Sequence, residues 1–121
     1  MERIAIVVTA DVEKKRLASA GADVRVIGQR AAVALPFNTS DRDVDTLAKK
    51  LGATLTVVEV EVESGMRCED ITAWTYDAPG RKNERDVSDE ANDVFESWEL
   101  DAAFDEEQVA LAIAWALIER L

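Results

Sequence analysis

The chain has 121 residues, 48% of them hydrophobic and 32% charged, and its 25 acids and 14 bases give a formal net charge of -11. This length predicts a single domain over residues 1–121, and this hydrophobic fraction excludes an intrinsically disordered chain. Direct nucleic-acid binding is excluded too, because affinity for a phosphate backbone depends on a surplus of Lys and Arg. With no histidine and one cysteine, the chain has neither a Ser-His or Cys-His nucleophile pair nor a zinc site of Cys and His.

The apolar segments are too short for a signal peptide or a membrane helix. A short apolar run, Ile4 to Val8, follows the first three residues, and the longest such run is Val109 to Ile118. A spanning helix needs roughly 20 apolar residues. The single Cys68 indicates a thiol in a reducing compartment. We therefore expect a cytoplasmic protein that binds no membrane.

The first half of the chain predicts the order strand, helix, strand, strand, helix, strand. The expected ranges are 3–9, 11–20, 22–27, 31–35, 40–51 and 53–62. Gly21 is expected to end the first helix in the left-handed conformation, and Ser40 with Asp43 approximates a capping box for the second. This order predicts an α+β fold with a ferredoxin-like βαββαβ core over about residues 1–62. A small doubly wound α/β sheet is the alternative.

The second half predicts one more strand, over 71–76, and two C-terminal helices. Residues 77–86 are expected to form an exposed polar loop. Ser88 is expected to cap a helix that runs to about Leu100, and Asp105 with Gln108 to cap the last helix. The domain would thus have a sheet-forming half, 1–76, on which an acidic helical half, 84–121, packs.

The excess negative charge lies in the second half. Residues 63–121 contain sixteen acids and five bases, whereas residues 1–37 contain four acids and six bases. On a helical wheel, one stripe of the first C-terminal helix is apolar: Val87, Ala91, Val94, Phe95, Trp98 and Ala102. The opposite side, which we call the acidic face, is formed by Asp86, Asp89, Glu90, Asp93 and Glu96. Like charges at these spacings repel, so the acidic face destabilises the helix that carries it.

Three interpretations of this charge compete: a solvated face that aids solubility, adaptation to high salt, and a docking face for a basic partner. The basic first third argues against adaptation to salt. For docking, carboxylates three and four residues apart lie about 5–6 Å apart at Cβ, a spacing comparable to that of backbone phosphates. In charge pattern and size, the chain resembles small acidic inhibitors that mimic nucleic acid, including phage proteins that act on restriction or CRISPR machinery.

The leading hypothesis is therefore a non-enzymatic module that docks on a basic protein surface, such as that of a nucleic-acid-binding protein. It requires no catalytic residue, no cofactor and no metal. The predicted partner-binding residues are Glu84, Asp86, Asp89, Glu90, Asp93, Glu96, Glu99, Asp101, Asp105, Glu106 and Glu107.

Two alternatives remain open. The first is a small enzyme or ligand- or metal-binding subunit that places Glu59, Glu61 or Asp70 in a concave pocket. Glu59, Glu61 and Glu63 share one strand face, and we favour a solvated face over a cation site. The second alternative is a homodimeric assembly subunit, because the last helix is apolar on all sides. Its interface would use Leu111, Trp115 and Ile118; the competing explanation is a central, buried helix.

Two weaker patterns are set aside. Asp41 to Asp45 begins like a calcium loop, but Thr46 and Gly52 stand where such a loop needs Gly and Glu. Arg81, Lys82 and Arg85 form a small basic segment, expected to supply counterions for Asp86 and Asp89.

Overall fold

The computed structural model describes residues 5–62, 71–98 and 105–121 of the chain. In these residues the protein is α+β, with a six-stranded antiparallel sheet and four helices. The elements are, in order, β1 (Ala5–Ala10), α1 (Lys14–Leu17), β2 (Ala22–Ile27), β3 (Arg30–Leu35), α2 (Asp41–Leu51), β4 (Leu55–Val62), β5 (Ile71–Ala78), β6 (Lys82–Asp86), α3 (Ser88–Ser97) and α4 (Glu106–Arg120). None of the helices described here is long and apolar enough to cross a membrane.

The strands lie in the order β2-β3-β1-β4-β5-β6, so the first strand of the chain is central in the sheet. All six residues of β1 are buried. Successive side chains of a strand point to opposite faces, and β1 accordingly contributes Val7 to one core and Ile6 and Val8 to another. Both faces of the central strands are therefore covered, which explains why β1 is apolar throughout.

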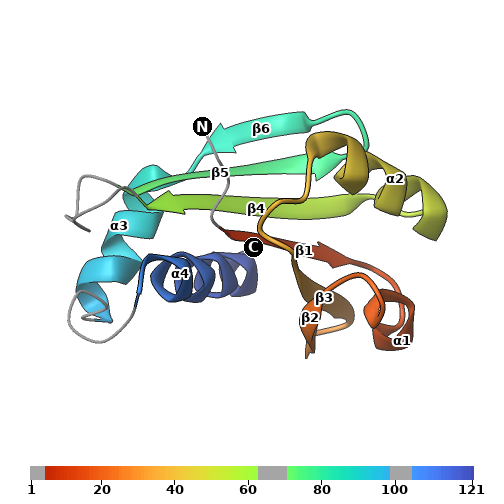
Figure 1. The fold of residues 1–121 in the computed structure, drawn as a ribbon, viewed down its shortest axis with the longest axis horizontal. Helices are drawn as coiled ribbons and strands as arrows, with labels where there is room; N and C mark the ends of the chain where they lie inside the picture. The colour runs from red at the N-terminus through yellow and green to blue at the C-terminus, as the bar shows by residue number, and fades with distance from the viewer. Residues whose placement is uncertain (1–4, 63–70, 99–104) are drawn as a thin grey trace.

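Each core is closed by one pair of helices. Apolar residues of α3 and α4 pack with Val7, Val58 and Val60, whereas α1 and α2 pack on the opposite face of the sheet, with Val8 and Val57. Figure 1 shows α3 and α4 together at one end of the molecule, and α1 and α2 at the other. One end of the molecule is thus formed by helices from the second half of the chain, and the other by helices from the first half.

The local signals for helix ends are confirmed where they were clearest. The Ser40 hydroxyl accepts a hydrogen bond from the Asp43 backbone N–H at 3.1 Å, and the Asp43 carboxylate accepts one from the Ser40 N–H at 3.4 Å. Gly52 ends α2 in the left-handed conformation, with φ 64. Asp105 caps α4 by accepting from the Gln108 N–H at 2.8 Å.

The segment between β1 and β2 differs from the prediction. The helix covers only Lys14–Leu17, and Gly21 is not among the residues with positive φ. A Cβ at Gly21 would lie 2.0 Å from the Ala34 carbonyl oxygen of β3. Glycine is needed here for close approach of two backbones, and not to end a helix.

The prediction of a loop over residues 77–86 is also wrong, because residues 82–86 form the edge strand β6. All five residues of β6 are exposed, so the strand has no apolar alternation to reveal it. It pairs with β5 through the backbone, with Asp86 opposite Trp74 and Lys82 opposite Asp77. The sheet therefore continues beyond the predicted boundary at residue 76.

The start of α3 differs as well. Val87 occupies the N-cap position without a side-chain hydrogen bond. Instead, the Asp86 carboxylate accepts from the Ser88 N–H at 2.8 Å, and the Ser88 hydroxyl accepts from the Ala73 N–H of β5 at 3.1 Å. Ser88 therefore joins the helix to the sheet and does not cap it.

Replacing Gly21 by Ala tests the close approach of the two backbones. We expect Gly21→Ala to lower the free energy of unfolding by about 1–3 kcal/mol, because β2 must move away from β3 to admit the Cβ. Gly28→Asn is the control: nothing lies within 4 Å of a Cβ at Gly28, and Asn tolerates a positive φ. Urea unfolding of both variants measures the effect; equal stabilities would contradict this role of Gly21.

Candidate functional site

Four residues of the acidic face lie on the solvent side of α3, as predicted, whereas Asp86 is the last residue of β6 and not part of the helix. All members of the acidic face are exposed: Asp86, Asp89, Glu90, Asp93 and Glu96. The opposite side of the segment is buried in the core closed by α4, through Val87, Ala91, Val94 and Phe95. The carboxylates are therefore presented by a helix whose orientation is fixed by packing.

Trp98 does not belong to the buried stripe of α3. Its side chain is 51% exposed, although its spacing from Val94 and Phe95 is that of a core residue. The helix ends at Ser97, and Trp98 has φ -97 and ψ 1, so the helical projection no longer applies at this residue. Ala102, predicted for the same stripe, lies outside the described residues.

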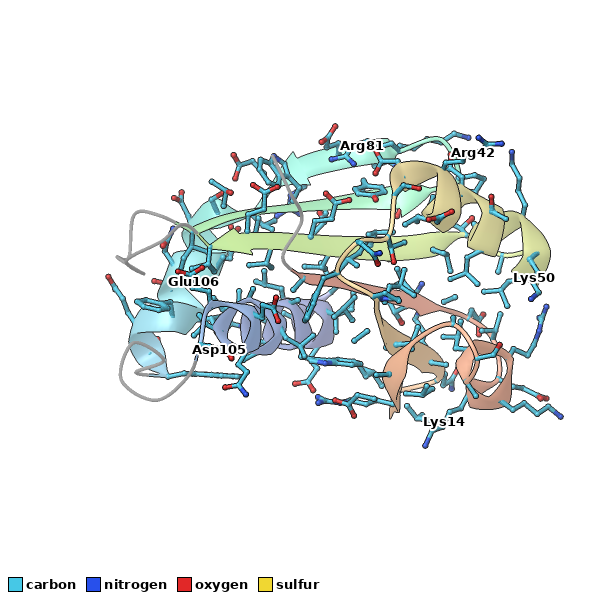
Figure 2. The ribbon with its side chains drawn as sticks, in the orientation of Figure 1. Lys14, Arg42, Lys50, Arg81, Asp105 and Glu106 are labelled. Carbon is cyan, nitrogen blue, oxygen red and sulfur yellow. The ribbon has the colours of Figure 1, made fainter. Side chains whose placement is uncertain are left out.

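The first turn of α4 adds further carboxylates at the same end of the molecule. Asp105 and Glu107 are exposed, and Glu106 is half-buried. Figure 2 shows Asp105 and Glu106 at the end of the molecule where α3 lies. We call this combined surface the acidic end; it comprises Asp89, Glu90, Asp93, Glu96, Asp105, Glu106 and Glu107.

The remaining predicted partner-binding residues are placed differently. Glu99 and Asp101 lie outside the described residues. Glu84 lies on β6 and accepts two hydrogen bonds from Arg81, at 2.8 and 3.1 Å. Because Arg81 binds its carboxylate, Glu84 contributes less to the charge available to a partner.

Arg81 and Arg85 are not the counterions of Asp86 and Asp89. Arg85 lies 3.8 Å from Glu90 in an exposed ion pair, and Arg81 forms ion pairs with Glu84 and Asp41. Exposed pairs such as Arg85 with Glu90 are weak. Among the described residues, Asp89, Asp93 and Glu107 form no ion pair, so these three carboxylates keep their charge toward solvent.

A second polar cluster was not predicted. Glu59 of β4 is only 5% exposed, and its carboxylate accepts a hydrogen bond from the Tyr76 hydroxyl at 2.6 Å and one from the Arg81 guanidinium at 3.4 Å. The same guanidinium lies 4.2 Å from the centre of the Tyr76 ring and 3.2 Å from an oxygen of Asp41. The expectation of a solvated Glu59 is wrong, because Arg81 covers it.

This arrangement, which we call the Arg81 cluster, attaches the β5–β6 hairpin to α2. The Gly80 backbone N–H of the hairpin also donates to Asp45 of α2 at 3.3 Å. The hydrogen bond between Arg81 and Glu84 raises the pKa of Arg81 and lowers the pKa of Glu84. Both groups therefore stay charged near neutral pH, so the ion pair between them persists there.

The Arg81 cluster offers little to a substrate or a cation. The Glu59 carboxylate is already bound by Tyr76 and Arg81, Glu61 is half-buried, and Glu63 and Asp70 lie outside the described residues. Among the described residues, no group of three or more His, Cys, Asp or Glu is placed to hold a metal ion.

The apolar helix α4 is covered within the chain. Trp115 is 5% exposed and Ile118 is 2% exposed, and Leu111 is partly buried against the same core. The Arg25 guanidinium of β2 lies 3.9 Å from the centre of the Trp115 ring. Burial of Trp115 and Ile118 removes the reason for which a second copy was expected at this helix.

Comparisons with protein-family models, curated proteins and solved structures found no match to this chain. The feature that stands out is the acidic end, held by packing and open to solvent.

Removal of the Arg81 side-chain charge tests whether the Arg81 cluster stabilises the fold. We expect Arg81→Met to cost about 1.5–3 kcal/mol of stability, because the buried Glu59 carboxylate loses a charged donor. Lys82→Met removes a neighbouring exposed cation and should change stability by less than about 0.5 kcal/mol. Urea unfolding at neutral pH measures both; an equal loss in the two variants would show that Glu59 does not depend on Arg81.

The stability of the protein should depend on pH through the Asp86 carboxylate at the start of α3. Hydrogen bonds from the side chain and backbone of Ser88 lower the pKa of Asp86. The stability contributed by the ionised carboxylate is complete above its unfolded pKa of about 3.9 and is lost as the pH falls through the lower folded value. In acid, wild type should thus lose stability relative to Asp86→Asn. A stability difference that is constant with pH would contradict this.

Proposed function

We propose that this protein is a non-enzymatic binding module whose acidic end docks on the basic surface of a partner protein. The observation that carries the proposal is the placement of α3. One side is anchored by Val94 and Phe95 in the core, and the other exposes carboxylates at helical spacing. A rigidly held surface loses little conformational entropy on binding.

Repulsion among the carboxylates of α3 destabilises the helix, and this supports a functional role for them. Asp89 and Glu90 lie in the first turn of α3 and gain from the helix dipole. Asp93 and Glu96 lie beyond that turn, where repulsion between like charges at these spacings is not offset in this way. A basic partner would replace the repulsion by attraction.

In its sharpest form, the proposal is that the protein inhibits its partner by occupying a site for nucleic acid. Arg and Lys residues that bind phosphates can bind carboxylates with the same donors. The spacing of the exposed carboxylates along α3 is comparable to that of phosphates on a strand. The resemblance in size and charge pattern to small acidic inhibitors of restriction and CRISPR machinery supports the same conclusion.

For the fold, we propose that β1 to β4 with α1 and α2 form a ferredoxin-like core. The sub-order β2-β3-β1-β4 and the placement of α1 and α2 on one face support this. The β5–β6 hairpin then extends the sheet, and α3 and α4 cover the face that the core leaves open. A fold of this kind indicates no function by itself, so the added elements carry the proposal.

Neutralising part of the acidic end tests the proposed function. Asp89→Asn/Asp93→Asn keeps the side-chain shapes and removes two charges. We expect its affinity for a fluorescein-labelled polyarginine peptide, measured by fluorescence anisotropy, to fall about tenfold. The affinity of wild type should also decrease with added salt.

The matched control is Asp11→Asn/Glu13→Gln, which removes the same charge from exposed positions at the opposite end. It should bind the peptide like wild type, with circular dichroism confirming that both variants fold. Equal losses in the two variants would mean that net charge alone attracts the peptide. The proposal would then be wrong.

A further inference from the structure

The end of the molecule opposite α3 is basic. We call it the basic end; it comprises Lys14, Lys15 and Arg16 of α1 and Lys49 and Lys50 of α2. The Arg16 guanidinium donates to the Leu51 carbonyl oxygen at 2.8 Å, which brings α1 to the last turn of α2. Figure 2 shows Lys14 and Lys50 on the far side of the molecule from Asp105 and Glu106.

The charges of the basic end are available to a partner. All five side chains are exposed. Lys15 lies 3.1 Å from Glu13, and this is the only ion pair between the basic end and the described residues. Asp11 and Glu13 precede α1, and Asp45 lies one turn before Lys49 on α2. The five cations outnumber these three acids.

We propose that the basic end of one copy docks on the acidic end of a second copy, head to tail. The two surfaces are complementary, because each copy carries an exposed cationic surface and an exposed anionic surface at opposite ends. Because the two surfaces differ, the contact is heterologous, and successive contacts extend a chain of copies. The inference rests on the proposed function, since it uses the same acidic end as the binding surface.

The net charge of -11 does not prevent this contact. Charges are screened over a Debye length of about 8 Å at physiological salt. Between the two ends lies β4, whose eight residues extend about 26 Å at roughly 3.3 Å per residue. The two acidic ends of docked copies are therefore separated by several Debye lengths, and the opposite charges at the contact dominate.

Exposed ion pairs contribute little each, so the association should be weak and sensitive to salt. We expect the mass measured by sedimentation velocity to rise with protein concentration at about 0.15 M NaCl, where the Debye length is about 8 Å. At about 1 M NaCl, where the Debye length is about 3 Å, the protein should sediment as a monomer. A wild-type protein that stays monomeric at every concentration at about 0.15 M NaCl would overturn the inference.

Variants locate the contact. Lys49→Gln/Lys50→Gln at the basic end and Asp89→Asn/Asp93→Asn at the acidic end should each weaken self-association about tenfold. An equimolar mixture of the two variants keeps one intact contact per pair and should form a heterodimer that does not extend. Arg42→Gln/Lys82→Gln removes two exposed cations outside the basic end and should associate like wild type. An equal loss in this control would overturn the inference.

The same variants separate this inference from the proposed function. Lys49→Gln/Lys50→Gln retains the acidic end, so it should bind the polyarginine peptide like wild type while self-associating about tenfold more weakly. If wild type binds the peptide through the acidic end but never self-associates, only the head-to-tail contact is wrong. Binding of a labelled single-stranded DNA by a monomeric wild type, lost in Lys49→Gln/Lys50→Gln, would instead identify an anionic polymer as the occupant and overturn the proposal.

Discussion

The packing of α4 on the central strands β1 and β4 is the interaction on which the rest of the structure depends. This helix covers one face of the sheet with side chains such as Ile113 and Leu117, which meet Val7, Val58 and Val60. Burying each such side chain contributes about 1.5–3 kcal/mol. Because α3 packs on α4 and β5, the direction in which the carboxylates of α3 point also follows from this contact.

The same packing separates apolar from charged surface. The apolar sides of the four helices are used by the two cores, and their polar sides form two ends of opposite charge. Between these ends, the Arg81 cluster holds the exposed hairpin against α2 through Glu59 and Tyr76. The hairpin therefore has a polar attachment in place of an apolar one, which explains how β6 remains ordered with every residue exposed.

A net charge of -11 describes this molecule poorly, because the charge is unevenly placed. An acidic end held by a rigid helix supports a docking role, and a basic end on the far side supports contact between copies. Both proposals depend on local charge at distances shorter than a few Debye lengths. They predict different consequences for substitutions at the two ends, so the head-to-tail contact can fail while the docking role stands.

Features that depend on neighbouring residues could be predicted from the sequence: the capping box of Ser40 and Asp43, the end of α2 at Gly52, the cap at Asp105 and the exposed side of α3. The close approach at Gly21, the burial of Glu59 and the existence of β6 could not, because they depend on contacts with other segments of the chain. The partner of Glu59, Arg81, lies 22 residues away in sequence, and β6 pairs through backbone groups that every residue possesses. Contacts of these two kinds leave no periodic pattern in side chains, which is the signal that sequence analysis uses.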